Sequence, residues 1–177
     1  MWLFAYGSLI FRPSFTFLER RRAFVRGWAR RFWQGSPDHR GVPEAPGRVV
    51  TLVPSDEGTC GGCAYRIDVG EAEAILAALD LREQAGFVRR LLPLHAAPDE
   101  EPFAEGVTRV AGASNVHFLG PLPEPDIAAY IRNRHGPSGS NVEYALKLLE
   151  ALRALEVNDA HVEEIARHLA SAVVESP

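Results

Sequence analysis

The residues near the N-terminus that are best suited to chemistry form one short run. The apolar start of the chain predicts a buried strand, which leads directly into Gly7 and Ser8. A glycine turn after a strand lets the backbone come close to a ligand, and its amide groups can converge on an anion or a carbonyl oxygen. Most such turns only reverse the chain, so this run alone leaves a structural role open.

A second candidate is the carboxylate of Glu83. It follows an apolar helical stripe that includes Leu79 and Leu81, and it precedes the strand-like Phe87. Burial raises the pKa of a carboxyl group, which suits the group to acid–base chemistry near neutral pH. The pattern alone favours the alternative, a solvated residue at a helix end that pairs with Arg82.

Other kinds of site have weaker support in the sequence. Cys60 and Cys63 enclose two glycines and have no second Cys or His pair nearby, so we expect a glycine-linked turn or a strand start instead of a redox or zinc site. Ser8 lacks the flanking glycines of a nucleophile elbow. The six histidines show no spacing typical of a metal site, and none is predicted: His39, His95, His117, His135, His161 and His168.

Six arginines lie between residues 20 and 31, and aromatic residues are interleaved with them as far as Trp33. Proteins that bind single-stranded nucleic acid use this combination. The basic excess is local, however, because the net charge of the whole chain is −4. We therefore expect these arginines to lie on a solvated face or in internal salt bridges, and we predict no nucleic-acid partner.

The composition predicts what kind of molecule must position these groups. The chain has 177 residues, of which 46% are hydrophobic and 24% charged, so we expect one globular domain over 1–177. No apolar stretch reaches the roughly 18 residues of a membrane helix, and no basic segment precedes the apolar start. These features predict a cytoplasmic protein without a membrane partner.

The order of the elements predicts an α+β fold, with a small mixed barrel-like sheet, helices packed outside it and helices at the C-terminal end. Apolar and β-branched runs predict strands at residues 2–5, 23–33, 48–53, 63–67, 87–95 and 103–111. Apolar stripes and capping residues predict helices over 70–84, over 124–135, from Ser140 or Asn141, and from Asn158 or Asp159 to about Val174. The stretch 36–47 is rich in proline and glycine and must be a long ordered loop or a mobile lid.

Several motifs occur in a fixed order and together resemble the ChaC family of glutathione-specific γ-glutamylcyclotransferases. The resemblance covers about residues 1–165. The motifs are Tyr6-Gly7-Ser8-Leu9-Ile10, Arg30 to Ser36, Asp38 to Gly41, Pro46 to Leu52, Ala64-Tyr65-Arg66, Leu81-Arg82-Glu83, and Gly136 to Gly139 with Asn141, Glu143 and Tyr144. It implies a γ-glutamylcyclotransferase-like fold and a reaction on glutathione. In that reaction the γ-glutamyl amine attacks its own γ-carbonyl, which gives 5-oxoproline and releases cysteinyl-glycine.

The resemblance also implies roles for particular residues. Glu83 matches the catalytic glutamate of the family, and Tyr144 matches a tyrosine that lines the pocket. Arg40 lies in the matched motif, and we expect it to bind substrate because a guanidinium suits the terminal carboxylate. The loop that binds the γ-glutamyl group through its backbone is matched by Leu3, Phe4, Ala5, Tyr6, Gly7 and Ser8. Glutathione is the implied partner, no metal or organic cofactor is implied, and the oligomeric state is left open.

The chain departs from the family pattern at two positions near these residues. Ala5 stands where a glycine is common, and Phe87 replaces a frequent tyrosine, which leaves selectivity open. Two alternatives therefore stay beside the leading hypothesis. One is a cyclotransferase for other γ-glutamyl amino acids or amines, and the other is a non-catalytic, arginine-rich binding module.

Overall fold

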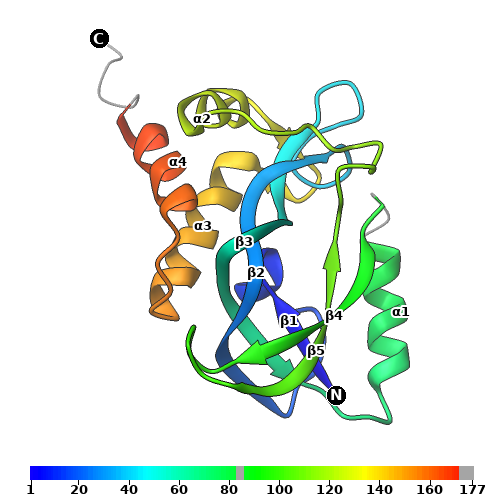
Figure 1. Cartoon of the computed structure of the whole chain (residues 1–177). Coiled ribbons are helices and arrows are strands. Elements are labelled where there is room, and N and C mark those ends of the chain that lie inside the picture. Colours follow the sequence, from blue (N-terminus) through cyan, green and yellow to red (C-terminus); the bar gives the residue numbers. More distant parts are fainter. Residues whose placement is uncertain (83–85, 172–177) are drawn as a thin grey trace.

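The computed structural model describes residues 1–82 and 86–171. Its centre is a closed barrel with the strand order β1-β3-β2-β4-β5, and helices pack around the outside (Figure 1). The strands are β1 (Trp2–Ala5), β2 (Glu19–Ser36), β3 (Gly47–Arg66), β4 (Val88–His95) and β5 (Pro102–Val110). The predicted α+β barrel is confirmed.

The two longest strands, β2 and β3, form one antiparallel ribbon that curves around the barrel (Figure 1). Pairing runs from Glu19 opposite Arg66 to Ser36 opposite Gly47. The sequence predicted two strands where β3 is one, because a proline and a glycine interrupt the apolar pattern between residues 54 and 58. In the structure this interruption is a shift of register opposite Gly27, whose φ of 80° only glycine adopts easily.

The prediction of a turn or strand start at the cysteines was wrong, because Cys60 and Cys63 lie inside β3. The glycines between them have a packing role. A Cβ on Gly62 would lie 2.3 Å from the carbonyl oxygen of Ala5, and a Cβ on Gly61 would lie 2.6 Å from Val157. Only a residue without a side chain lets β1 come this close to β3.

The short strand β1 closes the barrel. It pairs antiparallel with β3, where Ala5 lies opposite Cys63, and parallel with β5, where Leu3 lies opposite Val107. After Ala5 the backbone leaves the sheet and forms the single turn η1 (Ser8–Ile10), in which the Ile10 N–H donates to the Gly7 carbonyl at 3.0 Å. The predicted strand and glycine turn are therefore both present.

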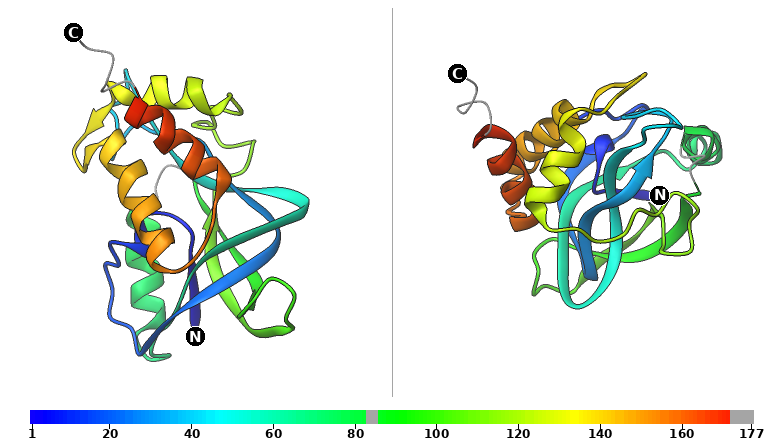
Figure 2. Two further views of the ribbon diagram at one scale, coloured as in Figure 1. Left: turned by 90° about the vertical axis from the view of Figure 1, so that its left-hand side faces the viewer. Right: turned by 90° about the horizontal axis from the view of Figure 1, so that it is seen from above.

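The helices form two groups around the barrel. Helices α2 (Glu124–Arg132), α3 (Asn141–Ala154) and α4 (Ala160–Ser171) pack together on one side, and α1 (Ala72–Arg82) lies apart on another (Figures 1 and 2). The Ser140 hydroxyl caps α3 by accepting the Glu143 N–H at 3.0 Å. The predicted end of α4 near Val174 lies outside the described residues.

Between α2 and α3 the predicted break is a two-stranded hairpin of β6 (His135–Gly136) and β7 (Gly139–Ser140). Behind it, the buried faces of α3 and α4 meet the inner part of β2. Fully buried side chains fill this contact, among them Phe32, Leu148, Leu152 and Ile165. The core thus holds the ends of β2 and α3 in place, and the candidate site lies where these ends meet β1.

Candidate active site

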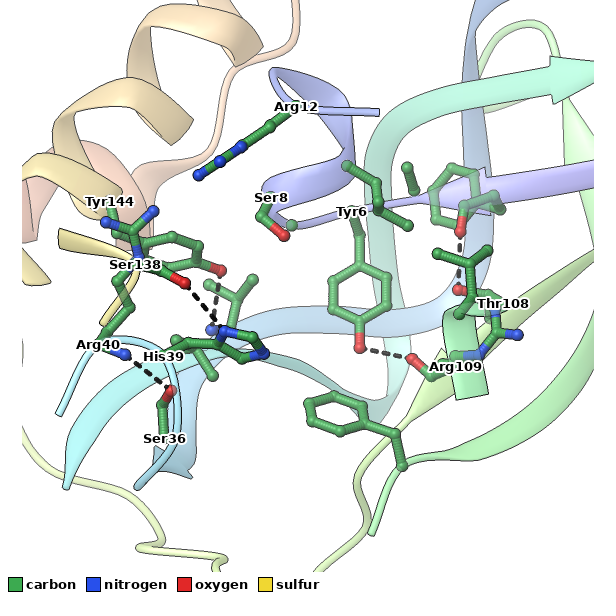
Figure 3. Close-up of a pocket in the computed structure, with 18 of the residues that line it drawn as sticks. Tyr6, Ser8, Arg12, Ser36, His39, Arg40, Thr108, Arg109, Ser138 and Tyr144 are labelled. Carbon is green, nitrogen blue, oxygen red and sulfur yellow. Dashed lines mark hydrogen bonds between the residues drawn. The ribbon is translucent and has the colours of Figure 1, made fainter. Parts of the chain in front are cut away.

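One pocket opens where β1 ends (Figure 3). Segments that are far apart in the sequence line it: the end of β1 with its turn, the end of β2 with the following loop, β3, α1, Phe87 just before β4, β5, and the start of α3. Eight of the nine residues predicted for the site lie here, namely Leu3, Phe4, Ala5, Tyr6, Gly7, Ser8, Arg40 and Tyr144. We call the stretch Leu3–Ser8 the floor of the pocket.

The ninth residue, Glu83, lies outside the described residues, so its predicted role stays a prediction. The described residues on either side of that segment, Leu79 and Phe87, both line the pocket. Asp80, one turn of α1 earlier than that segment, has a different task. Its carboxylate accepts from Arg89 Nε and from Arg109 Nε, each at 2.9 Å, and these bonds hold its pKa below the usual range.

The floor is fixed by hydrogen bonds from three sides. The Tyr6 hydroxyl donates to the carbonyl of Arg109 at 2.6 Å, and the Thr108 hydroxyl donates to the carbonyl of Phe4 at 2.9 Å. Arg30 Nε donates to the carbonyl of Tyr6 at 2.7 Å. Since these partners are themselves buried, the backbone of the floor has one well-determined position.

Arg30 is the central support of this arrangement. Its side chain is fully buried, and it also donates to the carbonyl of Gly61 and to Asp159 Oδ2, the latter at 2.5 Å. The guanidinium therefore joins the floor, β3 and the start of α4. A buried charge with this number of partners is fully compensated, which allows it to lie under the pocket.

Tyr144 lies beside Gly7 at the start of α3. Its hydroxyl oxygen accepts the Val50 N–H at 3.4 Å, and its ring packs edge-on against Phe32 with ring centroids 5.8 Å apart. A Cβ on Gly7 would lie 3.3 Å from this hydroxyl and 3.1 Å from a methyl of Val50. Gly7 therefore lets Val50 and Tyr144 pack close to the backbone of the floor.

Arg40 lines the pocket, but its guanidinium already has partners in the protein. It donates to the carbonyl of Ser140 at 3.1 Å and to Glu143 Oε2 at 3.4 Å, and it lies 5.3 Å from the centre of the Tyr144 ring. The side chain is only 6% exposed. These contacts tie the loop after β2 to the first turn of α3.

The same loop is attached at further points, so residues 36–47 form an ordered segment. The Ser138 N–H donates to the carbonyl of His39 at 3.0 Å, and His39 Nδ1 lies 2.9 Å from the Ser138 hydroxyl. Just after the loop, in β3, the Asn141 side chain accepts the Arg48 N–H at 2.6 Å and donates to the Arg48 carbonyl at 2.7 Å. The predicted ordered loop is present in the structure, and the mobile lid stays a prediction.

Reasoning from sequence missed several residues of the pocket. The residues of β5 that line it, Val107, Thr108 and Arg109, are more than 100 positions from the floor, and no local pattern predicts the parallel pairing of β1 with β5. Arg12 was also missed, although it follows the glycine turn closely. We call Arg12, Asp38 and His39 the rim of the pocket, because these charged or titratable side chains line it while retaining exposure to solvent.

The competing interpretations of the cysteines and histidines find little support. Both thiols are buried and free, and burial raises the pKa of Cys60 to about 11, so it is protonated at neutral pH. Within the described ranges, no group of three His, Cys, Asp or Glu side chains could hold a metal ion.

The arginines of β2 mostly have partners within the protein. Arg26 donates to the carbonyls of Pro98 and Glu100, and Arg22 pairs with Glu156 at 3.3 Å. Among the helices of the described residues, none combines the length and apolar character needed to cross a membrane.

Comparison with known proteins identifies relatives of this chain. The family model described as ChaC-like protein matches residues 1–172. The chain is 40% identical to gamma-glutamylcyclotransferase 2-3 of Arabidopsis thaliana over 99% of this chain and 92% of that protein. It is 38% identical to glutathione-specific gamma-glutamylcyclotransferase 1 of Homo sapiens over 93% of this chain and 76% of that protein.

A solved structure agrees with these relatives. The crystal structure of the yeast gamma-glutamylcyclotransferase specific to glutathione matches 97% of this chain and 96% of its own, with a TM-score of 0.90 and 27% sequence identity. Fold, family model and curated relatives agree over nearly the whole chain. The chain belongs to the ChaC-like family.

Proposed function

We propose that this protein converts glutathione to 5-oxoproline and cysteinyl-glycine. The observation that carries the proposal is the rigid floor of the pocket at Leu3–Ser8, in a chain whose family members include glutathione-specific γ-glutamylcyclotransferases. The reaction is intramolecular, so the reacting groups already belong to one molecule. The enzyme must hold the γ-glutamyl group in a reactive conformer, and a rigid floor supports that task.

We further propose that the backbone of the floor holds the γ-glutamyl group. Gly7 lines the pocket, and without a Cβ its backbone stays uncovered for a ligand. Backbone amides directed at the γ-carbonyl would stabilise the negative charge that develops on its oxygen. Tyr144 forms the neighbouring wall.

The chemical step needs one group that first accepts and then donates a proton, and we assign this role to Glu83. The substrate amine is an ammonium ion at neutral pH, so it loses a proton to the carboxylate before its nitrogen attacks the γ-carbonyl carbon. A new C–N bond closes the ring, and the original amide C–N bond breaks. The carboxylate passes this proton to the departing cysteine nitrogen, which leaves as an amine. The new ring nitrogen gives up a second proton, which converts that amine to its ammonium form, so neither water nor a cofactor is consumed. The position of Leu79 and Phe87 in the pocket supports this assignment.

We also retain three predictions from composition: a single catalytic domain, no nucleic-acid or membrane partner, and action in the cytoplasm. The pair of buried free cysteines supports a reducing compartment. The decisive test of the function is to incubate the purified protein with glutathione and to measure 5-oxoproline and cysteinyl-glycine by mass spectrometry. Equal amounts of both products are expected. A protein that forms 5-oxoproline from other γ-glutamyl compounds but not from glutathione would contradict the proposal.

A further inference from the structure

Three arginines line the pocket, and two of them already have carboxylate partners. Arg40 pairs with Glu143 and donates to the carbonyl of Ser140. Arg109 pairs with Asp80 at 2.8 Å and donates to the carbonyl of Leu76, also at 2.8 Å. Both guanidinium groups are almost completely buried, and their bonds hold elements of the fold together. Neither can turn to a ligand without giving up these bonds.

The third arginine, Arg12, is arranged differently. Its backbone N–H donates to the carbonyl of Ser8 at 2.8 Å, which fixes the residue at the end of the turn that follows the floor. Its side chain is exposed and lines the pocket, and Figure 3 shows it pointing towards the region between Ser8 and Tyr144. Across residues 1–82 and 86–171, no carboxylate forms an ion pair with it.

The length of the substrate allows its far end to lie away from the floor. With the γ-glutamyl group on the floor, the cysteinyl-glycine half extends by about 7 Å, the reach of two residues of extended chain. Because the floor is buried and Arg12 and Asp38 of the rim are exposed, we place this half of the substrate, which ends in a carboxylate, along the rim. Asp38 is the acidic side chain of the rim, and it lies next to His39, 3.9 Å from Nε2, and accepts from the Ser36 hydroxyl. The positive charge available to a carboxylate is therefore that of Arg12.

We propose that Arg12 binds the C-terminal carboxylate of the substrate and so selects γ-glutamyl peptides with a free terminal carboxylate. This proposal rests on the proposed function and assigns to Arg12 the role expected from sequence for Arg40. Arginine suits the task because its planar guanidinium can form two parallel hydrogen bonds to one carboxylate. Because Arg12 contacts a part of the substrate that does not react, its bond is the same in the ground state and in the transition state. Its loss raises KM and leaves kcat nearly unchanged.

The test compares glutathione with glutathione C-terminal amide, which has the same reacting atoms but no terminal negative charge. For the wild-type protein we expect kcat/KM to be about tenfold higher for glutathione than for the amide, the size of a charge-assisted contact at a partly exposed site. In Arg12→Gln this ratio falls to nearly one, because kcat/KM drops for glutathione and stays within twofold for the amide. Arg12→Lys keeps part of the preference.

Arg153→Gln is the matched control. It removes the same charge at the exposed far end of α3, about 18 Å along the helix from Asn141, and the ratio should not change. Equal wild-type rates on the acid and the amide, or an unchanged ratio in Arg12→Gln, would overturn the proposal while 5-oxoproline formation itself upholds the function. Absence of product from both substrates in the wild-type protein would instead overturn the proposed function and the role of Arg12 with it.

Discussion

The floor and the rim of the pocket differ in how far the protein itself fixes them. On the floor, Leu3 to Tyr6 are buried, and the carbonyls of Phe4 and Tyr6 accept hydrogen bonds from side chains beneath. On the rim, Arg12 and Asp38 are exposed, and the His39 side chain remains 40% exposed. Groups whose bonds are satisfied within the fold hold a fixed geometry, whereas the exposed guanidinium of Arg12 is available to a ligand. One small pocket can therefore separate two tasks: the floor positions the reacting atoms, and the rim selects the remainder of the substrate.

The same type of substitution, at Arg30 beneath the floor and at Arg12 on the rim, tests this difference most strongly. Arg30→Gln should lower the free energy of unfolding by about 3 kcal/mol, because it leaves the Asp159 carboxylate and two buried carbonyls without their partner. Arg12→Gln should change it by less than about 0.5 kcal/mol, as expected for an exposed side chain. Urea denaturation followed by circular dichroism measures both. If the two variants lose similar stability, the floor is not held as described.

The chemical step is tested by Glu83→Gln. The amide keeps the size of the side chain and cannot carry the proton, so we expect kcat to fall roughly 10²-fold or more. The control is Glu73→Gln on the exposed first turn of α1, which should leave kcat unchanged. Initial rates of 5-oxoproline formation give the answer, and a variant within a few-fold of wild type would remove Glu83 from the mechanism.

The floor is next tested by filling the space beside it. Gly7→Ala places a Cβ 3.1 Å from Val50, which needs a small shift, and Gly7→Val adds two methyl groups to an already tight position. We expect kcat/KM to fall a few-fold for alanine and about tenfold or more for valine, consistent with the energies of overpacking. Both variants should lose activity equally on glutathione and on its C-terminal amide. A changed preference between these substrates would show that floor and rim are not separate.

The smallest expected effect concerns the support behind the floor. His161 Nε2 accepts the Phe32 N–H at 3.0 Å, and Nδ1 lies 2.9 Å from Glu124 Oε1, so the neutral ring donates from Nδ1. Burial lowers the pKa of His161, although the Glu124 carboxylate acts in the opposite direction. The unfolded state therefore binds the proton more readily, and the stability that this histidine provides is present above its unfolded pKa of about 6.5.

As the pH falls from about 6.5 towards the lowered pKa of folded His161, this contribution is lost, at most about 1.4 kcal/mol for each pH unit. His161→Gln removes the titration. The difference in unfolding free energy between pH 7 and pH 5 should therefore be smaller in the variant than in the wild-type protein. Equal pH dependence in the two proteins would mean that His161 is not the group that titrates.

The sequence could predict those features that depend on residues close together in the chain, and not those that depend on distant residues. The strand before Gly7 and the start of α3 depend on neighbouring residues. The strand was predicted correctly, and of the two caps predicted for α3, Ser140 and Asn141, the structure has Ser140. The glycines between the cysteines resemble a turn locally. Glycines are needed there because Ala5 and Val157, from distant parts of the chain, pack closely against them, so the local pattern was misleading.

The two arginines illustrate the same limit at the site. From sequence, Arg40 is a free cation in a motif, because Glu143 lies 103 positions away and its ion pair becomes visible only in the fold. No role was predicted for Arg12, because an isolated arginine after a turn is common. Which cation has a partner is decided by tertiary packing and not by residue type.

The parallel pairing of β1 with β5 has a consequence for the order in which the protein is made. Trp2 and Leu3 leave the ribosome before their partners Gly106 and Val107, which follow about a hundred residues later. At 5–20 residues per second, the first strand waits roughly 5–20 s before the floor can be completed. Such long-range closure also slows folding, since a large loop must be ordered before the contact forms. The residues of β1 are therefore synthesised long before they can reach their final place in the barrel, and until then a nascent chain carries no finished pocket.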